Sequence, residues 1–157
     1  MTNLKKILIL LPIFTIIFLC SGCPNDYPDF KIQMLQQIND IRTKGCLCGP
    51  DTMPPAGLLI WSDLLEIAAI RHVKDMAANT NVEHFGSDGS FPYQRTLDAG
   101  FQGLIGENIG RGSITVDDIM ERWINSEQHC KTIMNEKYSY FAVAYEDYCW
   151  VQMFGGD

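Results

Sequence analysis

The sequence predicts an α+β domain in which helices lie around a small antiparallel sheet. Two segments in the first half carry apolar residues at helical spacing, and the C-terminal part changes to runs rich in β-branched and aromatic residues. The chain contains no internal repeat and no low-complexity tract. Its 157 residues are enough for one hydrophobic core, so we expect a single folded domain.

A first amphipathic helix is expected at residues 31–44. Its apolar side chains recur at the i, i+1, i+4 and i+7 positions and form one buried stripe, which consists of Met34, Leu35, Ile38 and Ile41. Gly45 ends this helix. Residues 46–57 then contain three prolines, so we expect a loop there.

A second helix is expected to begin at Ser62 or Asp63 and to present an apolar stripe as far as Met76. Trp61, just before it, is expected to pack into the core. His72 falls inside the stripe. We therefore expect a hydrogen-bonded core histidine at this position and leave it out of the candidate site.

The middle of the chain is predicted to be less regular. Residues 79–82 break the second helix, and residues 84–92 form a loop whose Gly and Ser residues permit tight turns. Tyr93–Ala99 is expected to form a short helix that Gly100 stops in a left-handed conformation. Four glycines within residues 101–112 argue against a helix and favour an irregular strand.

The next helix is predicted to start with a side-chain cap. Thr115 is its expected N-cap, with Asp118 three residues later. Apolar residues follow at helical spacing on one face: Val116, Ile119, Met120 and Trp123. We expect this helix to carry Ser126 and His129 at its end.

The last part of the chain is predicted to form a hairpin. Tyr138–Tyr145 and Tyr148–Phe154 are two runs with strand composition. Glu146–Asp147 is expected to form the tight turn between them. The resulting antiparallel pair is the centre of the predicted sheet.

Residues 1–22 have the composition of a leader that is removed from the mature protein. Lys5 and Lys6 form a basic start, and the apolar run Ile7–Leu19 follows. This run of 13 residues is too short to span a bilayer comfortably. The sequence therefore predicts export.

The end of the leader, Leu19-Cys20-Ser21-Gly22-Cys23, resembles a bacterial lipobox. The resemblance implies that Cys23 is acylated and becomes the mature N-terminus, although Cys20 stands where an apolar residue is usual. We expect a lipoprotein anchored to the membrane at the bacterial cell envelope, with residues 23–30 as a tether and residues 31–157 as the domain. Ordinary cleavage near Gly22, followed by secretion, is the alternative.

The charge of the mature chain argues against a nucleic-acid-binding protein. Removal of the leader takes away two lysines and no acids, which leaves 10 basic residues against 19 acidic ones and a net charge of −9. A nucleic-acid surface requires clustered basic residues on one face. We therefore expect no nucleic-acid partner.

Four cysteines remain in the predicted domain: Cys46, Cys48, Cys130 and Cys149. Export places them in an oxidising compartment, where they can pair in three ways. A bond between Cys46 and Cys48 would close a short strained ring. A zinc site built from Cys and His is the competing interpretation, but these four cysteines include no CxxC pair.

Three motifs together resemble the bacterial branch of the CAP superfamily, which comprises cysteine-rich secretory proteins, antigen 5 and pathogenesis-related 1 proteins. They are His84–Ser90 (HFGSDGS), Gly106–Ile109 (GENI) and Trp123–Asn135 with the pattern WxxSxxHCxxIMN. The resemblance extends from about residue 34 to residue 155. It implies a three-layer α-β-α sandwich, and it favours disulfides between Cys48 and Cys130 and between Cys46 and Cys149.

The same resemblance implies that His84, Glu107 and His129 face one cleft. Two imidazoles and a carboxylate can bind a divalent ion such as zinc and leave a coordination position for water. Many eukaryotic members carry a second glutamate where this chain has Ser126. With one carboxylate fewer, the expected metal affinity is lower, and a hydrogen-bonded cluster without an ion is the alternative.

Function is predicted only in outline. The expected function is binding of a divalent metal or of an unidentified small-molecule, lipid or protein ligand at the cell envelope, without a defined reaction. A metal-assisted hydrolase is one alternative, and a purely structural envelope module is another. Ser126, His129 and Glu107 also suggest a nucleophile, a base and an orienting acid, but we favour a local hydrogen bond of Ser126 at a helix end, because nothing in the sequence indicates an oxyanion hole.

Overall fold

The computed structural model describes residues 29–157. The predicted leader and the lipidation site Cys23 lie outside the described residues. The elements are α1 (Phe30–Lys44), β1 (Cys46–Cys48), β2 (Asp51–Met53), β3 (Ile60–Trp61), α2 (Asp63–Asn79), α3 (Pro92–Asp98), β4 (Leu104–Arg111), α4 (Val116–Ile124), α5 (Glu127–Met134), β5 (Tyr140–Glu146) and β6 (Cys149–Gly156). Within this part of the chain, no helix has the length and apolarity needed to cross a bilayer.

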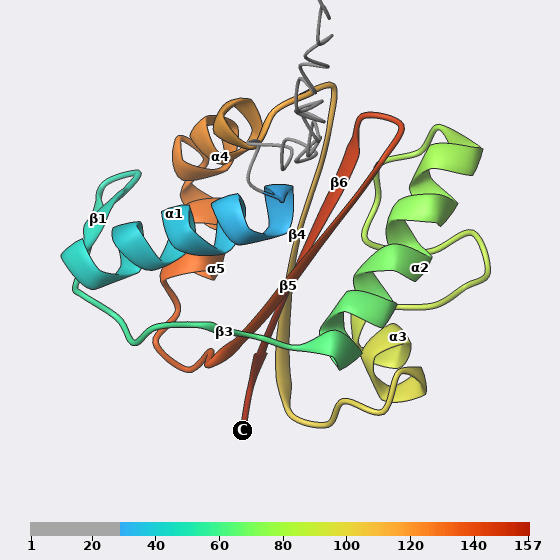
Figure 1. The fold of residues 1–157 in the computed structure, drawn as a ribbon, viewed down its shortest axis with the longest axis horizontal. Helices are drawn as coiled ribbons and strands as arrows, with labels where there is room; N and C mark the ends of the chain where they lie inside the picture. The colour runs from blue at the N-terminus through green and yellow to red at the C-terminus, as the bar shows by residue number, and fades with distance from the viewer. Residues whose placement is uncertain (1–28) are drawn as a thin grey trace, which may run out of the picture.

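The predicted three-layer sandwich is confirmed. A four-stranded sheet in the order β3-β5-β6-β4 forms the middle layer, and all its pairs are antiparallel except β3 with β5. Helices α2 and α3 lie on one side of this sheet, and α1, α4 and α5 lie on the other (Figure 1). The sequence did not predict the strand β3 or the β1–β2 hairpin, which occupies the segment expected to be a loop.

Strand alternation divides the core into two clusters. On β5, Phe141 and Val143 point to the cluster shared with α1, α4 and α5. Ala142 and Ala144, between and after them, point to the cluster under α2. Side chains of successive strand residues face opposite sides of a sheet, so both faces of β5 are buried.

The predicted helix starts are confirmed by side-chain caps. The Ser62 hydroxyl accepts a hydrogen bond from the backbone N–H of Leu65, and the Thr115 hydroxyl accepts one from Asp118. Helix α1 begins one residue earlier than expected, at Phe30. The Phe30 ring packs edge-on against Trp150 at 5.7 Å between centroids, so it belongs to the core and not to the tether.

The prediction of one helix that starts after Thr115 and carries Ser126 and His129 at its end is wrong, because the structure has two helices there. Helix α4 ends at Ile124, and α5 begins at Glu127 after Ser126, whose backbone is extended. The break lets the two segments bury different faces. In α4 the Trp123 indole N–H donates to Ile109 O at 3.1 Å, while α5 packs its apolar side chains beside β1 and α1.

The hairpin turn between β5 and β6 lies one residue later than predicted. Glu146 pairs with Cys149, so the two-residue loop consists of Asp147 and Tyr148. Both have positive φ, 43° and 64°. This is the backbone geometry of a type I′ turn, which matches the twist of a two-stranded ribbon.

Side chains occupy the outer edge of β4, the last strand of the sheet. The carbonyl oxygen of Ile105 accepts from the Tyr138 hydroxyl at 3.2 Å, and that of Arg111 accepts from the Arg122 guanidinium at 2.6 Å. The Trp123 indole binds the carbonyl of Ile109 between them. Three of the carbonyl groups on this outer edge, those of Ile105, Ile109 and Arg111, therefore have protein donors.

A buried arginine joins the layer of α1 to the rest of the domain. Arg42 is 0 % exposed, and its guanidinium donates to four carbonyl oxygens. The acceptors are Gly57 at 2.7 Å, Ile133 at 2.7 Å, Asn135 at 2.9 Å and Tyr138 at 3.0 Å. Burial lowers the pKa of this guanidinium, but arginine remains charged in proteins.

We predict that Arg42→Met destabilises the domain by at least about 3 kcal/mol, because it leaves several buried carbonyl groups without donors. Arg42→Lys should be intermediate, since an ammonium group has three donors and lacks the planar fork. Chemical denaturation measures both, with the exposed Lys44→Met on the same helix as control. Equal free energies of unfolding for Arg42→Met and Lys44→Met would contradict this role.

Candidate functional site

Glu107 on β4 is the centre of a buried polar network. Its Oε1 lies 2.8 Å from His84 Nδ1, and its Oε2 lies 2.8 Å from Arg95 Nη2. The side chains of Glu107 and Arg95 are 2 % and 1 % exposed, whereas that of His84 is 55 % exposed. The Glu107 carboxylate therefore binds the buried Arg95 through one oxygen and the solvent-exposed His84 through the other.

Arg95 on α3 also fixes the loop that carries His84. Its guanidinium donates to the carbonyl of Ser90 at 2.9 Å and to that of His84 at 3.1 Å. The backbone of Gly86 closes the same loop by donating to Ser90 O. Sequence reasoning missed Arg95, because the pattern of a short helix does not show which of its residues faces a buried acid.

His72 on α2 lies beside this network. Its Nε2 is 2.9 Å from the carbonyl oxygen of Glu83 and 3.9 Å from Glu107 Oε1. The predicted buried, hydrogen-bonded histidine is confirmed, with 1 % of the residue exposed. Burial lowers its pKa, and the nearby Glu107 carboxylate opposes that shift. A neutral His72 at neutral pH packs beside the ion pair without adding a second positive charge to Arg95.

His129 lies in the first turn of α5. Its Nδ1 is 2.8 Å from the hydroxyl oxygen of Ser126, the N-cap residue of the same helix. Burial lowers the pKa of His129, and the neighbouring His84 and Arg122 lower it further. The imidazole is therefore neutral at neutral pH and keeps one lone pair available.

Ser126 and His129 line a small cavity of about 210 Å³. The other lining residues are Ile109, Gly110, Ile119, Arg122 and Trp123. A side chain at Gly110 would enter this space, since a Cβ built there would lie 2.7 Å from Ile119 Cδ1. The glycine therefore keeps room between β4 and α4, next to the imidazole.

The edge strand β4 separates Glu107 from His129. Glu107 contacts α2 and α3, on one face of the sheet. The next residue, Asn108, points to the other face, where it donates to the backbone carbonyl of His129 at 3.2 Å and to Gln152 at 3.0 Å. Successive strand residues face opposite sides, so Glu107 is on the side away from α5.

The structure therefore brings together only part of the predicted site. Glu107 binds His84 and not His129, so the suggested arrangement in which Glu107 orients His129 behind Ser126 is wrong, although the Ser126–His129 contact itself is present. Within residues 29–157, the ligand atoms of His84, Glu107 and His129 do not form a group in which all lie within 4.8 Å of one another. His84 and His129 do interact electrostatically, since His84 is one of the groups that lower the pKa of His129.

The cysteines confirm one predicted bridge and correct the other. Cys48 and Cys130 form a disulfide with a Cα–Cα distance of 5.4 Å. The predicted disulfide between Cys46 and Cys149 is wrong, because both residues are free thiols. Cys149 is buried in the cluster under α2, whereas Cys46 packs beside Cys48 and Cys130 on the other side of the sheet.

Comparisons with solved structures agree with the fold. An extracellular protein containing an SCP domain from Bacillus anthracis str. Ames superposes with a TM-score of 0.73 and 26 % identity over 82 % of this chain. An outer surface protein from Borrelia burgdorferi gives a TM-score of 0.66 with 22 % identity, over 82 % of this chain and 96 % of that one. A cysteine-rich secretory protein from Staphylococcus aureus subsp. aureus Mu50 gives 0.65 with 16 % identity, over 85 % of this chain and 40 % of that one.

Two of the three solved relatives, from Bacillus anthracis and Staphylococcus aureus, are much longer than the matched part, since this chain covers 40 % of each. The chain is also 38 % identical over 53 residues to the uncharacterized protein YkwD of Bacillus subtilis (strain 168), a match that covers 32 % of this chain and 21 % of YkwD. The model of the cysteine-rich secretory protein family, CAP, matches residues 35–154. This match covers most of the chain, and together with the shared fold it shows that the protein belongs to the CAP family of cysteine-rich secretory proteins.

Proposed function

We propose that this protein is an exported CAP-domain protein whose His84 and His129 imidazoles bind a divalent metal ion or a small ligand at the cell envelope. Zinc is the expected ion. One observation supports the proposal: the Nδ1 atom of each imidazole is hydrogen-bonded to a protein oxygen. The partner is Glu107 Oε1 for His84 and Ser126 Oγ for His129. Each ring therefore keeps Nε2 for a ligand.

This pattern is that of metal-binding histidines, which usually give their second ring nitrogen to a carboxylate, a carbonyl or a water. The ionised Glu107 can only accept, so His84 Nδ1 carries the proton and Nε2 carries the lone pair. Both Glu107 oxygens already have partners, His84 and Arg95. We therefore assign Glu107 an orienting role in place of the ligand role that the family resemblance implied.

The state of His129 also favours a metal. Burial lowers its pKa, and the neutral ring offers a lone pair at neutral pH. When Ser126 Oγ accepts from Nδ1–H, the lone pair is on Nε2. A divalent ion bound there would act as a Lewis acid toward a small ligand and would lower the pKa of a bound water.

We predict that wild-type protein binds zinc in a calorimetric titration at neutral pH and that His84→Ala and His129→Ala each abolish this binding. Ser126→Ala should weaken it by about tenfold, because outer hydrogen-bond partners contribute a factor of about 10–100 to metal affinity. Ser139→Ala, at an exposed hydroxyl, is the matched control.

The zinc affinity should also fall as the pH drops below about 6.5, because the pKa of His129 lies below this ordinary value and its proton competes with the metal only there. Removal of zinc by a chelator should leave the fold intact, since the network of Glu107 and Arg95 does not depend on the ion. Unchanged titration curves for both histidine variants would show that the ion binds elsewhere.

A metal-assisted hydrolase that acts on an envelope or extracellular substrate is the second candidate. The cavity beside Ser126 and His129 favours it, because a substrate group placed there would lie next to the neutral imidazole and the Arg122 guanidinium. The serine hydroxyl can also act as donor to His129 Nδ1, which would put the ring proton on Nε2. The metal site and a serine nucleophile therefore require opposite tautomers of His129.

We predict that ¹⁵N NMR of His129 finds the proton on Nδ1, as the metal site requires. Hydrolysis of peptide, ester or glycan substrates, if it occurs, should then stop with a chelator and survive Ser126→Ala. A proton on Nε2, with turnover that ignores the chelator and is lost in Ser126→Ala, would instead assign a serine hydrolase. Absence of turnover in every condition would leave binding as the function.

We further propose that the protein is anchored outside the cytoplasmic membrane through a lipid on Cys23. The leader and the lipobox-like residues before Cys23 support this. The described relatives include an extracellular protein and an outer surface protein. Few residues lie between Cys23 and α1, which starts at Phe30, so the domain would sit close to the membrane surface.

We predict that Cys23→Ser moves the protein from the membrane fraction to the soluble fraction. The wild-type N-terminal peptide should carry the mass of acyl chains, because a stable anchor requires more than one chain. Cys149→Ser, which removes a buried thiol of the domain, is the control and should stay in the membrane fraction. An N-terminal peptide without lipid would establish secretion in place of anchoring.

A further inference from the structure

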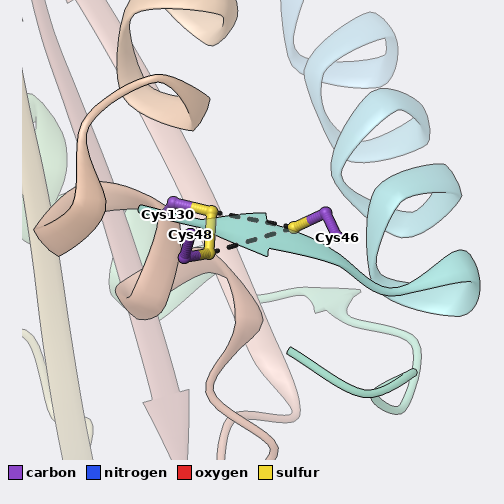
Figure 2. A group of neighbouring side chains, drawn as sticks. All are labelled: Cys46, Cys48 and Cys130. Carbon is purple, nitrogen blue, oxygen red and sulfur yellow. Dashed lines mark hydrogen bonds between the residues drawn. A yellow bond between two sulfur atoms is a disulfide. The ribbon is translucent and has the colours of Figure 1, made fainter. Parts of the chain in front are cut away.

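Three sulfur atoms meet between β1 and α5. Cys46 and Cys48 are two residues apart on β1, so their side chains leave the same face of the strand. Cys130 on α5 forms the disulfide with Cys48. The free Cys46 sulfur lies 3.7 Å from the Cys130 sulfur and 3.9 Å from the Cys48 sulfur (Figure 2), about the contact distance of two sulfur atoms.

The three cysteines differ in access to solvent. Cys48 and Cys130 are both 0 % exposed, whereas Cys46 is half-buried. The cluster around them is apolar and contains Met134 with Met53 at its border. The bridge is therefore shielded from thiols in solution, and among the described cysteines Cys46 is the free thiol that touches it.

We propose that these three cysteines form a thiol–disulfide exchange site in which Cys46 and Cys48 compete for Cys130. The deprotonated Cys46 sulfur attacks the Cys130 sulfur. A bond between Cys46 and Cys130 forms as the bond between Cys48 and Cys130 breaks, and Cys48 leaves as a thiolate that takes up a proton. One disulfide and one thiol are present before and after, so the step needs no oxidant or reductant.

Cys130 is the preferred target for two reasons. It is the closer of the two sulfurs. Attack on Cys48 would instead join residues i and i+2 of one extended strand, which closes a strained ring. Because the two distances are nearly equal, the Cys46 sulfur lies beside the bond, and in-line attack requires rotation of its side chain about Cα–Cβ.

The exchange would move an attachment point of α5. The helix would change its anchor on β1 by two residues, about 6–7 Å along an extended strand. Cys130 directly follows His129, so the step occurs next to a residue of the proposed site. Burial raises the pKa of the Cys46 thiol, which keeps the thiolate scarce and slows its attack on the bridge.

The test maps the bridges in the exported wild-type protein after an acid quench, with free thiols labelled by a maleimide in denaturant. We expect two populations, one labelled at Cys46 with Cys48 bridged and one labelled at Cys48 with Cys46 bridged. The Cys48–Cys130 form, separated at acid pH before any labelling and returned to about pH 8 where thiolates are available, should then take up label at Cys48. Cys149→Ser should show the same pattern, because Cys149 lies in the other cluster.

Two variants sharpen the result. In Cys46→Ser the Cys48 label should disappear, since no competing thiol remains. In Cys48→Ser, Cys46 should bridge to Cys130, so both Cys46 and Cys130 should stay unlabelled. The proposal is overturned if wild-type protein is never labelled at Cys48. It is also overturned if the separated Cys48–Cys130 form takes up no label at Cys48 at about pH 8. Neither outcome depends on whether Cys48→Ser folds.

Discussion

The guanidinium of Arg42 is the contact on which the placement of α5 depends. Two of its acceptors, Ile133 O and Asn135 O, belong to the C-terminal end of α5, where the helix dipole leaves partial negative charge. The other two, in the loop before β3 and at the entrance to β5, tie the same group to the sheet. Arg42 fixes one end of the short helix and the disulfide fixes its middle, so His129 in its first turn has a defined position.

Local patterns predicted the elements that depend on local chemistry. The starts of α2 and α4 followed from Ser62 and Thr115, whose hydroxyls act within three residues. The sequence indicated Ser126 as a helix end, but it did not predict the second helix that starts after it. The contacts beside the break, such as that of Trp123 with Ile109, join residues far apart in the sequence. The roles of Arg42 and Arg95 were not predicted for the same reason. The sequence shows an arginine on a helix, but it does not show the carbonyl or carboxylate group that the side chain binds.

In the candidate site, the family resemblance predicted which residues matter, but the alternation of side chains along β4 decides which of them meet. The motifs pointed to His84, Glu107 and His129 as a set, and the structure joins the first two. On an edge strand, a shift of one residue decides which face a side chain occupies. Asn108, and not Glu107, faces α5. Strand parity also directs Cys149 of β6 to the cluster under α2, away from Cys46, with which the family resemblance had paired it.

The donors along the outer edge of β4 have a consequence for behaviour at high concentration. An open strand edge offers carbonyl and N–H groups to a strand of another molecule, and sheets grow into aggregates by this route. Tyr138, Trp123 and Arg122 already occupy three of the outward carbonyls. At the opposite edge, β3 is only two residues long. Each edge of the sheet therefore offers only a short or partly occupied template, which disfavours pairing with a strand of another molecule.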